Sequence, residues 1–248
     1  MILLIYPKDP TIKRIEQHGN RVAKALTDVS SKFIIYPNEE SKRLIHQEMI
    51  RGEEDDLIVF MGHGRSTALF GARGKYYNRE EDVDYRVLQE NPEFLYNDEN
   101  FIDSSTYHLF KNKNVVLFAC VSNELGPLLI SSGAKGVLGF GKLPTTVTEF
   151  QDDWQFVKVN RHAVAALSGI IDVSFERAFI RVAKNNGNLV DLVYCIKNEI
   201  HWHISMLLYS RARYRYVLAD ILYAIEKSIV VFGKSDIPLI RESNHDAR

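Results

Sequence analysis

Two reactive side chains each follow a short apolar run. His63 comes two positions after the run 57–61, and Cys120 directly follows the run 115–119. Short runs with almost no polar residues are typical of buried strands in a parallel sheet. Ligands of open α/β sheets bind beyond the carboxyl ends of the strands, so two adjacent strands would bring an imidazole and a thiol into one crevice. The pattern predicts a Cys/His nucleophilic site.

The residues around this pair suit acyl transfer. A thiol is a weak nucleophile until a base or a cationic neighbour promotes the thiolate, so Cys120 is the expected nucleophile and His63 the expected base. Gly62 and Gly64 flank His63, allow a sharp turn and leave room for a substrate carbonyl. We therefore expect the backbone N–H groups of Gly64 and Cys120 to form the oxyanion hole.

Other interpretations of these residues stay open. A cysteine after apolar residues is commonly a small buried hydrophobe, and Gly-His-Gly can be only a turn. His108 is a second candidate base, although no predicted strand ends at it. His201 and His203 lack a completing acid or cysteine at metal-ligand spacing, so neither a metal nor another cofactor is expected.

Composition narrows the class of protein. The chain of 248 residues has 31 Lys and Arg against 32 Asp and Glu, a formal net charge of -1, which argues against a general nucleic-acid or anionic-membrane binder. No apolar run approaches the length of a membrane span, and the apolar start is too short for a signal peptide. Two cysteines and no sign of secretion favour a reducing cytoplasm.

Short apolar runs alternate with amphipathic ones, which indicates βαβ units and a mostly parallel sheet of about six strands in one domain. The expected strands are 1–6, 32–36, 57–61, 115–119, 136–140 and 199–209, and for the last of these a helix is the open alternative. The expected helices are 11–28, 39–51, 124–132, 146–160, 164–167, 173–183, 189–198 and 211–232, with a short one at 104–111. Residues 65–113 show little regular pattern and are expected to be an insertion or lid, and 243–248 a polar tail.

The His and Cys segments resemble a known family. Phe60-Met-Gly-His-Gly64 and Leu117-Phe-Ala-Cys-Val-Ser122, followed by residues 130–139, are similar to the CHAT group of caspase-like cysteine peptidases, relatives of caspases, separases and gingipains. The likeness covers roughly residues 1–210, and only the His and Cys motifs are specific.

The resemblance implies a caspase-like α/β/α sandwich with a helical C-terminal part. It also implies an endopeptidase with a Cys120–His63 dyad and no metal, used as a regulated effector in bacterial signalling or defence. Its partners would be a protein substrate and an activating or inhibitory protein, rather than nucleic acid or membrane. The alternative from another class is a catalytically silent adaptor or sensor with the same fold.

The chain also departs from the caspase pattern. Caspases carry Gln-Ala-Cys-x-Gly, whereas Phe118 precedes Ala119 here and Val121 follows the cysteine, so a preference for aspartate is not supported. The substrate-pocket candidates are Arg65, Ser66, Glu149, Asp152 and Asp153, although a solvated helix face is the favoured interpretation of the three acids.

Overall fold

The computed structural model describes residues 1–9, 13–36, 38–72, 100–144, 150 and 159–240. Its strands are β1 (Ile2–Pro7), β2 (Ser30–Ile35), β3 (Leu57–Met61), β4 (Gly64–Arg65), β5 (Ala68–Phe70), β6 (Asn100–Ile102), β7 (Asn114–Phe118), β8 (Gly136–Gly139) and β9 (Val230–Gly233). Its helices are α1 (Lys13–Ala25), α2 (Glu39–Arg51), α4 (Ser122–Ser131), α6 (Arg161–Lys184), α7 (Leu189–Tyr209) and α8 (Arg215–Ser228), with a 3₁₀ turn η4 (Tyr107–Phe110).

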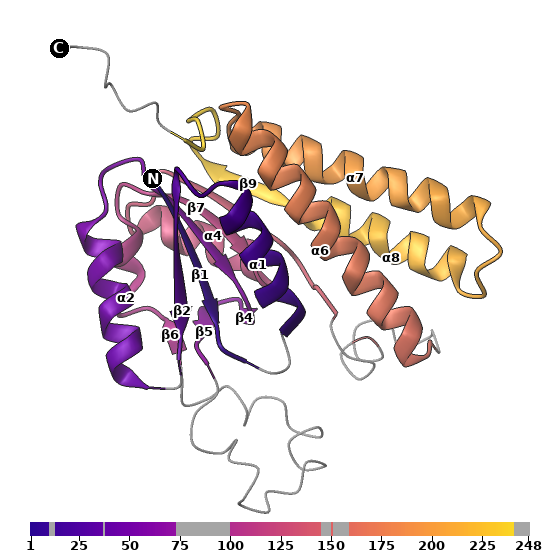
Figure 1. Cartoon of the computed structure of the whole chain (residues 1–248), viewed down its shortest axis with the longest axis horizontal. Helices are drawn as coiled ribbons and strands as arrows, with labels where there is room; N and C mark the ends of the chain where they lie inside the picture. Colours follow the sequence, from indigo (N-terminus) through magenta and orange to yellow (C-terminus); the bar gives the residue numbers. More distant parts are fainter. Residues whose placement is uncertain (10–12, 37, 73–99, 145–149, 151–158, 241–248) are drawn as a thin grey trace, which may run out of the picture.

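A six-stranded sheet forms the centre of the molecule, in the order β2-β1-β3-β7-β8-β9 (Figure 1). The first five of these strands are parallel, and β9 pairs antiparallel with β8. Helices cover both faces, so the predicted α/β/α sandwich with a mostly parallel sheet is confirmed. The strands that precede His63 and Cys120 are direct neighbours, with Met61 opposite Phe118 in the register.

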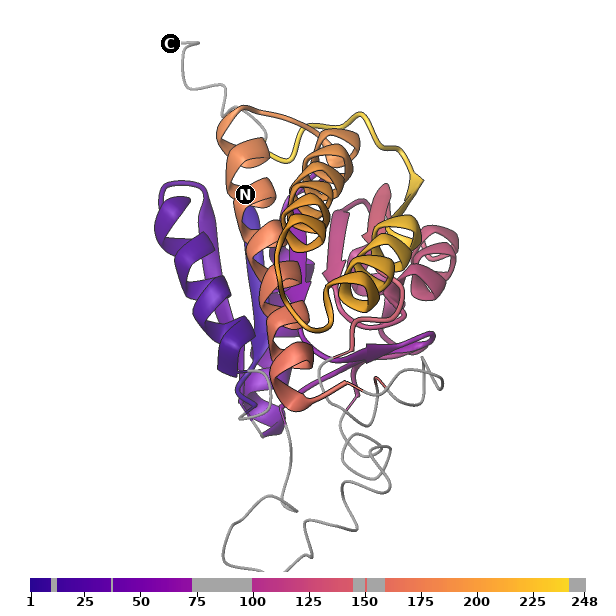
Figure 2. The ribbon, with the colours of Figure 1, turned by 90° about the vertical axis from the view of Figure 1, so that its right-hand side faces the viewer.

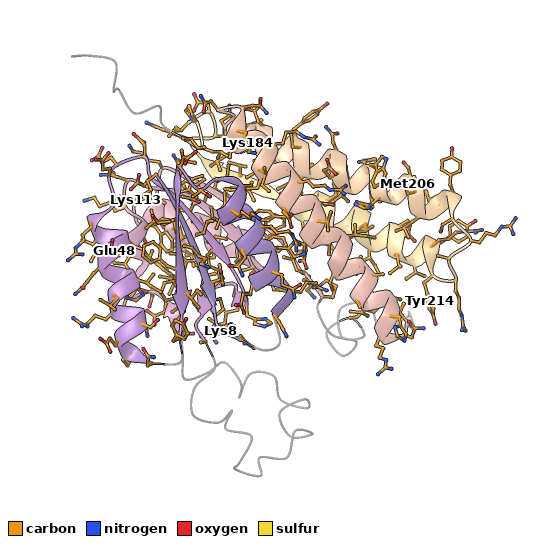
Figure 3. All side chains as sticks on the ribbon, in the orientation of Figure 1. Lys8, Glu48, Lys113, Lys184, Met206 and Tyr214 are labelled. Atoms are coloured by element: carbon orange, nitrogen blue, oxygen red, sulfur yellow. The ribbon has the colours of Figure 1, made fainter. Side chains whose placement is uncertain are left out.

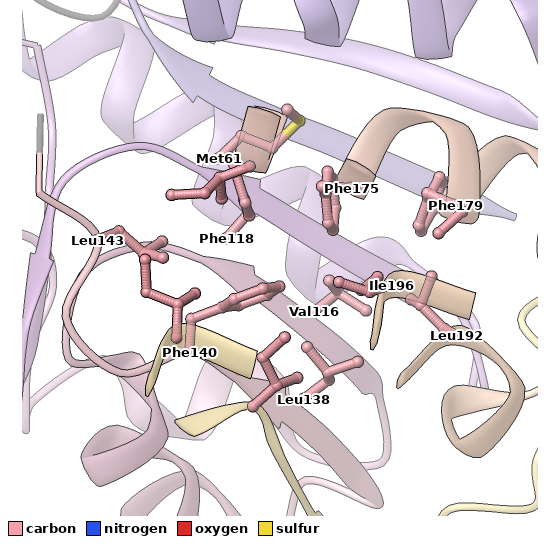
Figure 4. Close-up of a cluster of buried hydrophobic side chains, with 14 of the residues drawn as sticks. Met61, Val116, Phe118, Leu138, Phe140, Leu143, Phe175, Phe179, Leu192 and Ile196 are labelled. Atoms are coloured by element: carbon pink, nitrogen blue, oxygen red, sulfur yellow. The ribbon is translucent and has the colours of Figure 1, made fainter. Parts of the chain in front are cut away.

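Alternate residues of the strands enter two separate cores, as the pleat of a strand requires. Leu4, Val59 and Val116 face α1, α6, α7 and α8, while Leu3, Ile58 and Val115 face α2, α4 and η4. Figure 4 shows the first core, where Phe118 stacks on Phe175 of α6 with ring centroids 4.4 Å apart. Because both faces are covered, the strands have the continuous apolar runs seen in the sequence.

One predicted strand near the C-terminus was wrong, and the predicted helices around it have different bounds. Residues 199–209 were expected to be the sixth strand but belong to α7, and the sixth strand is instead β9, at the end of the expected helix 211–232. The alternation of apolar residues at 202–208 reflects the unusual exposure of Trp202, Met206 and Leu208 rather than a strand pattern. The helix α8 stops at Ser228, and the two short helices expected at 164–167 and 173–183 are one, α6.

The predicted insertion has structure at both ends. Its described residues form a small antiparallel sheet, β4-β5-β6, which the sequence did not predict, and then η4. Most of the expected helix 146–160, the middle of the insertion at 73–99 and the tail 243–248 lie outside the described residues. Among the helices that the structure describes, none is long and apolar enough to cross a membrane.

Candidate active site

The turn that carries Cys120 is fixed by one buried hydroxyl. Ser122 Oγ lies 2.8 Å from the carbonyl oxygens of both Leu117 and Ala119, and it accepts a hydrogen bond from the Phe140 N–H at 2.9 Å. Ser122 is fully buried, so these contacts are sheltered from water. A single side chain therefore connects the end of β7, the start of α4 and the end of β8.

The backbone next to Cys120 takes a conformation that its sequence disfavours. Val121 has φ 55° and ψ 19°, in the left-handed region that β-branched residues rarely occupy. The Val121 N–H donates to the Gly141 carbonyl at 2.9 Å, which helps to hold this geometry. Strained backbone of this kind persists only where surrounding structure enforces it, and it gathers at active sites and ligand-binding loops.

His63 and Cys120 occupy equivalent positions beyond their strands. Met61 and Phe118 are paired in the register, and each reactive residue comes two positions later. The Gly62 N–H donates to the Phe118 carbonyl at 3.1 Å, so the ladder continues up to the residue before His63. On the other side, the His63 carbonyl accepts from the Phe70 N–H at 3.1 Å, which ties it to β5.

Both reactive residues line one cavity of about 40 Å³. Its other walls come from α1, from the loop after β8 and from α6, and the full lining comprises Arg14, Ile15, Gly62, His63, Phe118, Cys120, Leu143, Pro144, Ser168, Ile171 and Asp172. Both His63 and Cys120 are half-buried, so solvent reaches the cavity beside them. The structure thus places His63 and Cys120, which the sequence predicted to share one crevice, on the wall of the same cavity.

The cysteine sulfur and the glycine after His63 have close neighbours. The Leu143 N–H donates to Cys120 Sγ at 3.3 Å. An N–H donor at sulfur favours the anionic form of a thiol, because charge-assisted hydrogen bonds are stronger than neutral ones. Gly64 lies close to the end of β7. A Cβ at Gly64 would be 3.2 Å from the Cys120 carbonyl oxygen and 3.0 Å from the Ala119 Cβ. A side chain at this position would require these neighbours to shift by a few tenths of an ångström.

Asp172 on the cavity wall belongs to an ion-pair cluster that joins α6 to α1. Its carboxylate contacts the Arg14 guanidinium and lies 3.8 Å from His18 Nε2. One turn later, Glu176 contacts His18 and pairs with Arg21 at 2.8 Å. Burial raises the pKa of Asp172, and the charge of the Arg14 guanidinium opposes that shift. Two arginines thus balance two carboxylates, and the acid in the cavity already has a cationic partner.

The sequence missed Arg14 and Asp172 as cavity residues. The sequence does contain an indication of Asp172, because a carboxylate among the apolar residues of 161–184 needs a partner or a function when it is buried. Nothing in the sequence marks Arg14, because it is an ordinary charged residue of an amphipathic helix. Only the fold brings its guanidinium into contact with Asp172. Ser168 is also absent from the predicted set, and its hydroxyl donates to the Pro144 carbonyl at 3.0 Å, which ties the cavity loop to α6.

The predicted substrate-pocket residues do not join the cavity where the structure describes them. Arg65 is exposed with its guanidinium over the Phe70 ring, and neither Arg65 nor Ser66 lines the cavity. Glu149, Asp152 and Asp153 lie outside the described residues. The alternative base His108 lines a different cavity, near Lys113 at the other end of the sheet, so His63 is the histidine beside Cys120.

The described residues offer no group of three His, Cys, Asp or Glu side chains that could hold a metal ion. His201 lies 3.0 Å from Glu226, and His203 packs against Trp202. Burial, with the Arg177 charge, lowers the pKa of His203. As expected for positions two apart on a helix, the two imidazoles have different neighbours.

Comparisons with known proteins identify no relative. The chain matches no protein-family model, no curated protein and no solved structure.

Proposed function

We propose that this chain is a cysteine endopeptidase in which Cys120 is the nucleophile and His63 the general base. The observation that carries the proposal is the cavity that both residues line beyond the carboxyl ends of β3 and β7, where the two occupy matched positions. The left-handed backbone of Val121 and the N–H donor at Cys120 Sγ support the proposal. Both features are typical of a catalytic cysteine, and a cysteine that only fills space in a hydrophobic core needs neither.

In the proposed cycle the Cys120 thiolate attacks the scissile carbonyl, and the His63 imidazolium protonates the leaving amine. The backbone N–H groups of Gly64 and Cys120 stabilise the oxyanion of the tetrahedral intermediate. His63 then takes a proton from water as the water attacks the thioester. The thioester bond breaks, the acid product leaves, and the proton on His63 restores the Cys120 thiol. A Cβ at Gly64 would lie 3.2 Å from the Cys120 carbonyl oxygen, so the two backbone segments that carry these amides run close together.

The proposal includes the setting implied by the resemblance to CHAT peptidases. The substrate would be a protein, and the enzyme a regulated effector in the bacterial cytoplasm, controlled by an activating or inhibitory protein partner. Neither nucleic acid nor a membrane would be a partner. The small sheet β4-β5-β6 supports the choice of segment 65–113 as the place of control, since it connects His63 to that segment.

A proteome-derived peptide library tests the activity. The wild type should produce new peptide termini with a shared residue at the cleavage position, detected by mass spectrometry. Cys120→Ala and His63→Ala should each abolish these cuts, because the two residues act as one unit. Cys195→Ser is the matched control. It removes the second cysteine, which does not line the cavity, and should keep full activity. Cuts that persist in Cys120→Ala would exclude Cys120 as the nucleophile. A wild type that makes no cuts and in which Cys120 alkylates no faster than Cys195 would favour the silent adaptor instead.

A further inference from the structure

The outward face of α7 exposes several large apolar residues, among them Tyr194, Trp202 and Tyr209. The helix packs against α6 and α8, and all three extend past the edge of the sheet (Figures 1 and 2). Figure 3 shows Met206 and Tyr214 at this end of the molecule, far from Glu48 on α2. We use the name α7 face for the exposed residues Val190, Tyr194, Asn198, Trp202, Ser205, Met206 and Tyr209.

These residues repeat at helical spacing and lie on one side of the helix. Tyr194 is 67%, Trp202 52% and Tyr209 91% exposed. From 192 to 210, every one of which is described, no exposed residue is an Asp, Glu, Lys or Arg. A helix side that meets only water normally carries charged residues, so an uncharged face with three large aromatics indicates a surface that another molecule covers.

Charges stand only at the two ends of the α7 face, and they differ in sign. Asp191 is exposed in the first turn, and Arg211 and Arg213 are exposed directly after the last turn. If two α7 helices pack antiparallel, Arg211 of one copy lies near Asp191 of the other, at both ends of the contact. If they pack parallel, arginines meet arginines and repel. The face is therefore complementary to itself in one orientation.

The area suits a stable contact. The exposed parts of two tyrosines, a tryptophan, a methionine and a valine amount to roughly 600–700 Å² per copy, since a large aromatic residue alone exposes about 150–250 Å² when free. Two copies would bury on the order of 1,200–1,400 Å², which reaches the range of specific interfaces. Twofold symmetric dimers are the commonest oligomers, and their contacts require self-complementary surfaces.

We propose that the α7 face is the interface of a homodimer, in which the two α7 helices pack antiparallel about a twofold axis near residue 200. The aromatic side chains form the centre of the contact, and the Asp191–Arg211 pairs form its rims. This inference concerns a surface remote from Cys120 and holds or fails independently of the peptidase proposal.

Sedimentation velocity between 1 and 100 μM tests the interface. The wild type should shift from monomer to dimer with rising concentration. Trp202→Glu places a charge at the centre of the contact and should raise the dimer dissociation constant at least tenfold. Tyr36→Glu changes an aromatic residue of similar exposure on the far side of the sheet, at the end of β2, and should leave the constant within twofold. Circular dichroism should show all three chains folded alike.

Disulfide trapping tests the orientation, in a chain with Cys120→Ser and Cys195→Ser. Asn198→Cys lies next to the axis and should give a covalent dimer under mild oxidation. Tyr209→Cys should not, because antiparallel packing separates the two copies of residue 209 by roughly 25 Å along the helices. Linkage through Tyr209→Cys would contradict the antiparallel arrangement.

Three results would overturn the proposal. The first is a wild type that stays monomeric at 100 μM, and the second is a dimer that Trp202→Glu leaves intact. The third is a monomer that binds phosphatidylserine vesicles through Trp202, which would assign the α7 face to a lipid surface.

Discussion

The backbone N–H of Leu143 donates a hydrogen bond to the sulfur of Cys120 at 3.3 Å. The donor comes from the loop after β8 and the acceptor from the end of β7, so the contact joins two neighbouring strand ends across the candidate site. An N–H donor in this position favours the thiolate, which is the reactive form of a thiol, because the N–H dipole stabilises its negative charge.

This contact predicts selective alkylation of Cys120. With iodoacetamide at pH 7, Cys120 should react at least tenfold faster than Cys195, measured by mass spectrometry of the digested protein. His63→Ala should slow the reaction at Cys120 at least tenfold, because the base that takes the thiol proton is lost. The rate at Cys195 in the same sample is the internal control, and equal rates at Cys120 with and without His63 would contradict the dyad.

Gly64→Ala should separate activity from stability. The added methyl would lie 3.0 Å from the Ala119 Cβ and 3.2 Å from the Cys120 carbonyl, so the turn of the nucleophile must shift by a few tenths of an ångström. We expect peptide cleavage to fall at least tenfold, since small displacements of a catalytic group are costly, with unfolding free energy reduced by only about 1 kcal/mol.

The control for that experiment is Gly169→Ala, because a Cβ at Gly169 of α6 meets no atom within 4 Å. It should leave cleavage unchanged and raise stability by about 0.5–1 kcal/mol, the usual gain of alanine over glycine inside a helix. Full activity of Gly64→Ala would show that the close approach at Cys120 has no catalytic importance.

Ser122→Ala should destabilise the fold markedly. The substitution removes the hydroxyl that lies beside the Leu117 and Ala119 carbonyls and leaves the buried Phe140 N–H without its acceptor. Leaving a buried donor unsatisfied costs about 1–3 kcal/mol, and the loss of the other contacts adds to it, so we expect a decrease of about 2–3 kcal/mol in urea unfolding.

Ser131→Ala is the matched control on the same helix. Its hydroxyl is exposed and contacts only carbonyls of α4, at Pro127 and Leu128, so the change should stay within about 0.5 kcal/mol. Equal effects of the two substitutions would show that Ser122 does not fasten the turn.

How far the sequence could predict this site depends on the range of each interaction. The placement of His63 and Cys120 beyond two buried strands was predictable, because the apolar run of a buried parallel strand is visible locally. The pairing of Arg14 with Asp172 was not, because it joins two helices 158 positions apart and no local pattern marks such a pair.

The error at residues 199–209 has a different physical cause. A sequence pattern indicates a surface helix when apolar residues recur every three to four positions and polar residues occupy the outward side. The outward side of α7 carries Trp202 and Met206 instead. Exposed apolar residues thus concealed a helix from the sequence pattern, and the same residues form the proposed interface. The strand β9 was hidden for a related reason, since its four residues directly follow the apolar face of α8.

His46 gives a prediction for pH dependence. Its imidazole packs on the Phe101 ring and its Nε2 donates to the Phe101 carbonyl at 2.8 Å, which ties α2 to β6. Burial lowers the pKa of His46, and the contact with the Phe101 carbonyl only partly opposes this shift. The unfolded chain therefore binds a proton more readily than the folded one, so the unfolding free energy should fall as the pH drops below about 6.5 through the lower folded pKa.

His46→Gln keeps a hydrogen-bond donor but does not titrate, so it isolates this effect. The difference in unfolding free energy between wild type and His46→Gln should move in favour of the variant between pH 7 and pH 5, measured by urea unfolding. An NMR titration of the His46 ring should give a midpoint below that of a histidine in an unfolded peptide. A midpoint above that value, with wild-type stability rising on acidification relative to the variant, would show that the Phe101 carbonyl outweighs burial at this position.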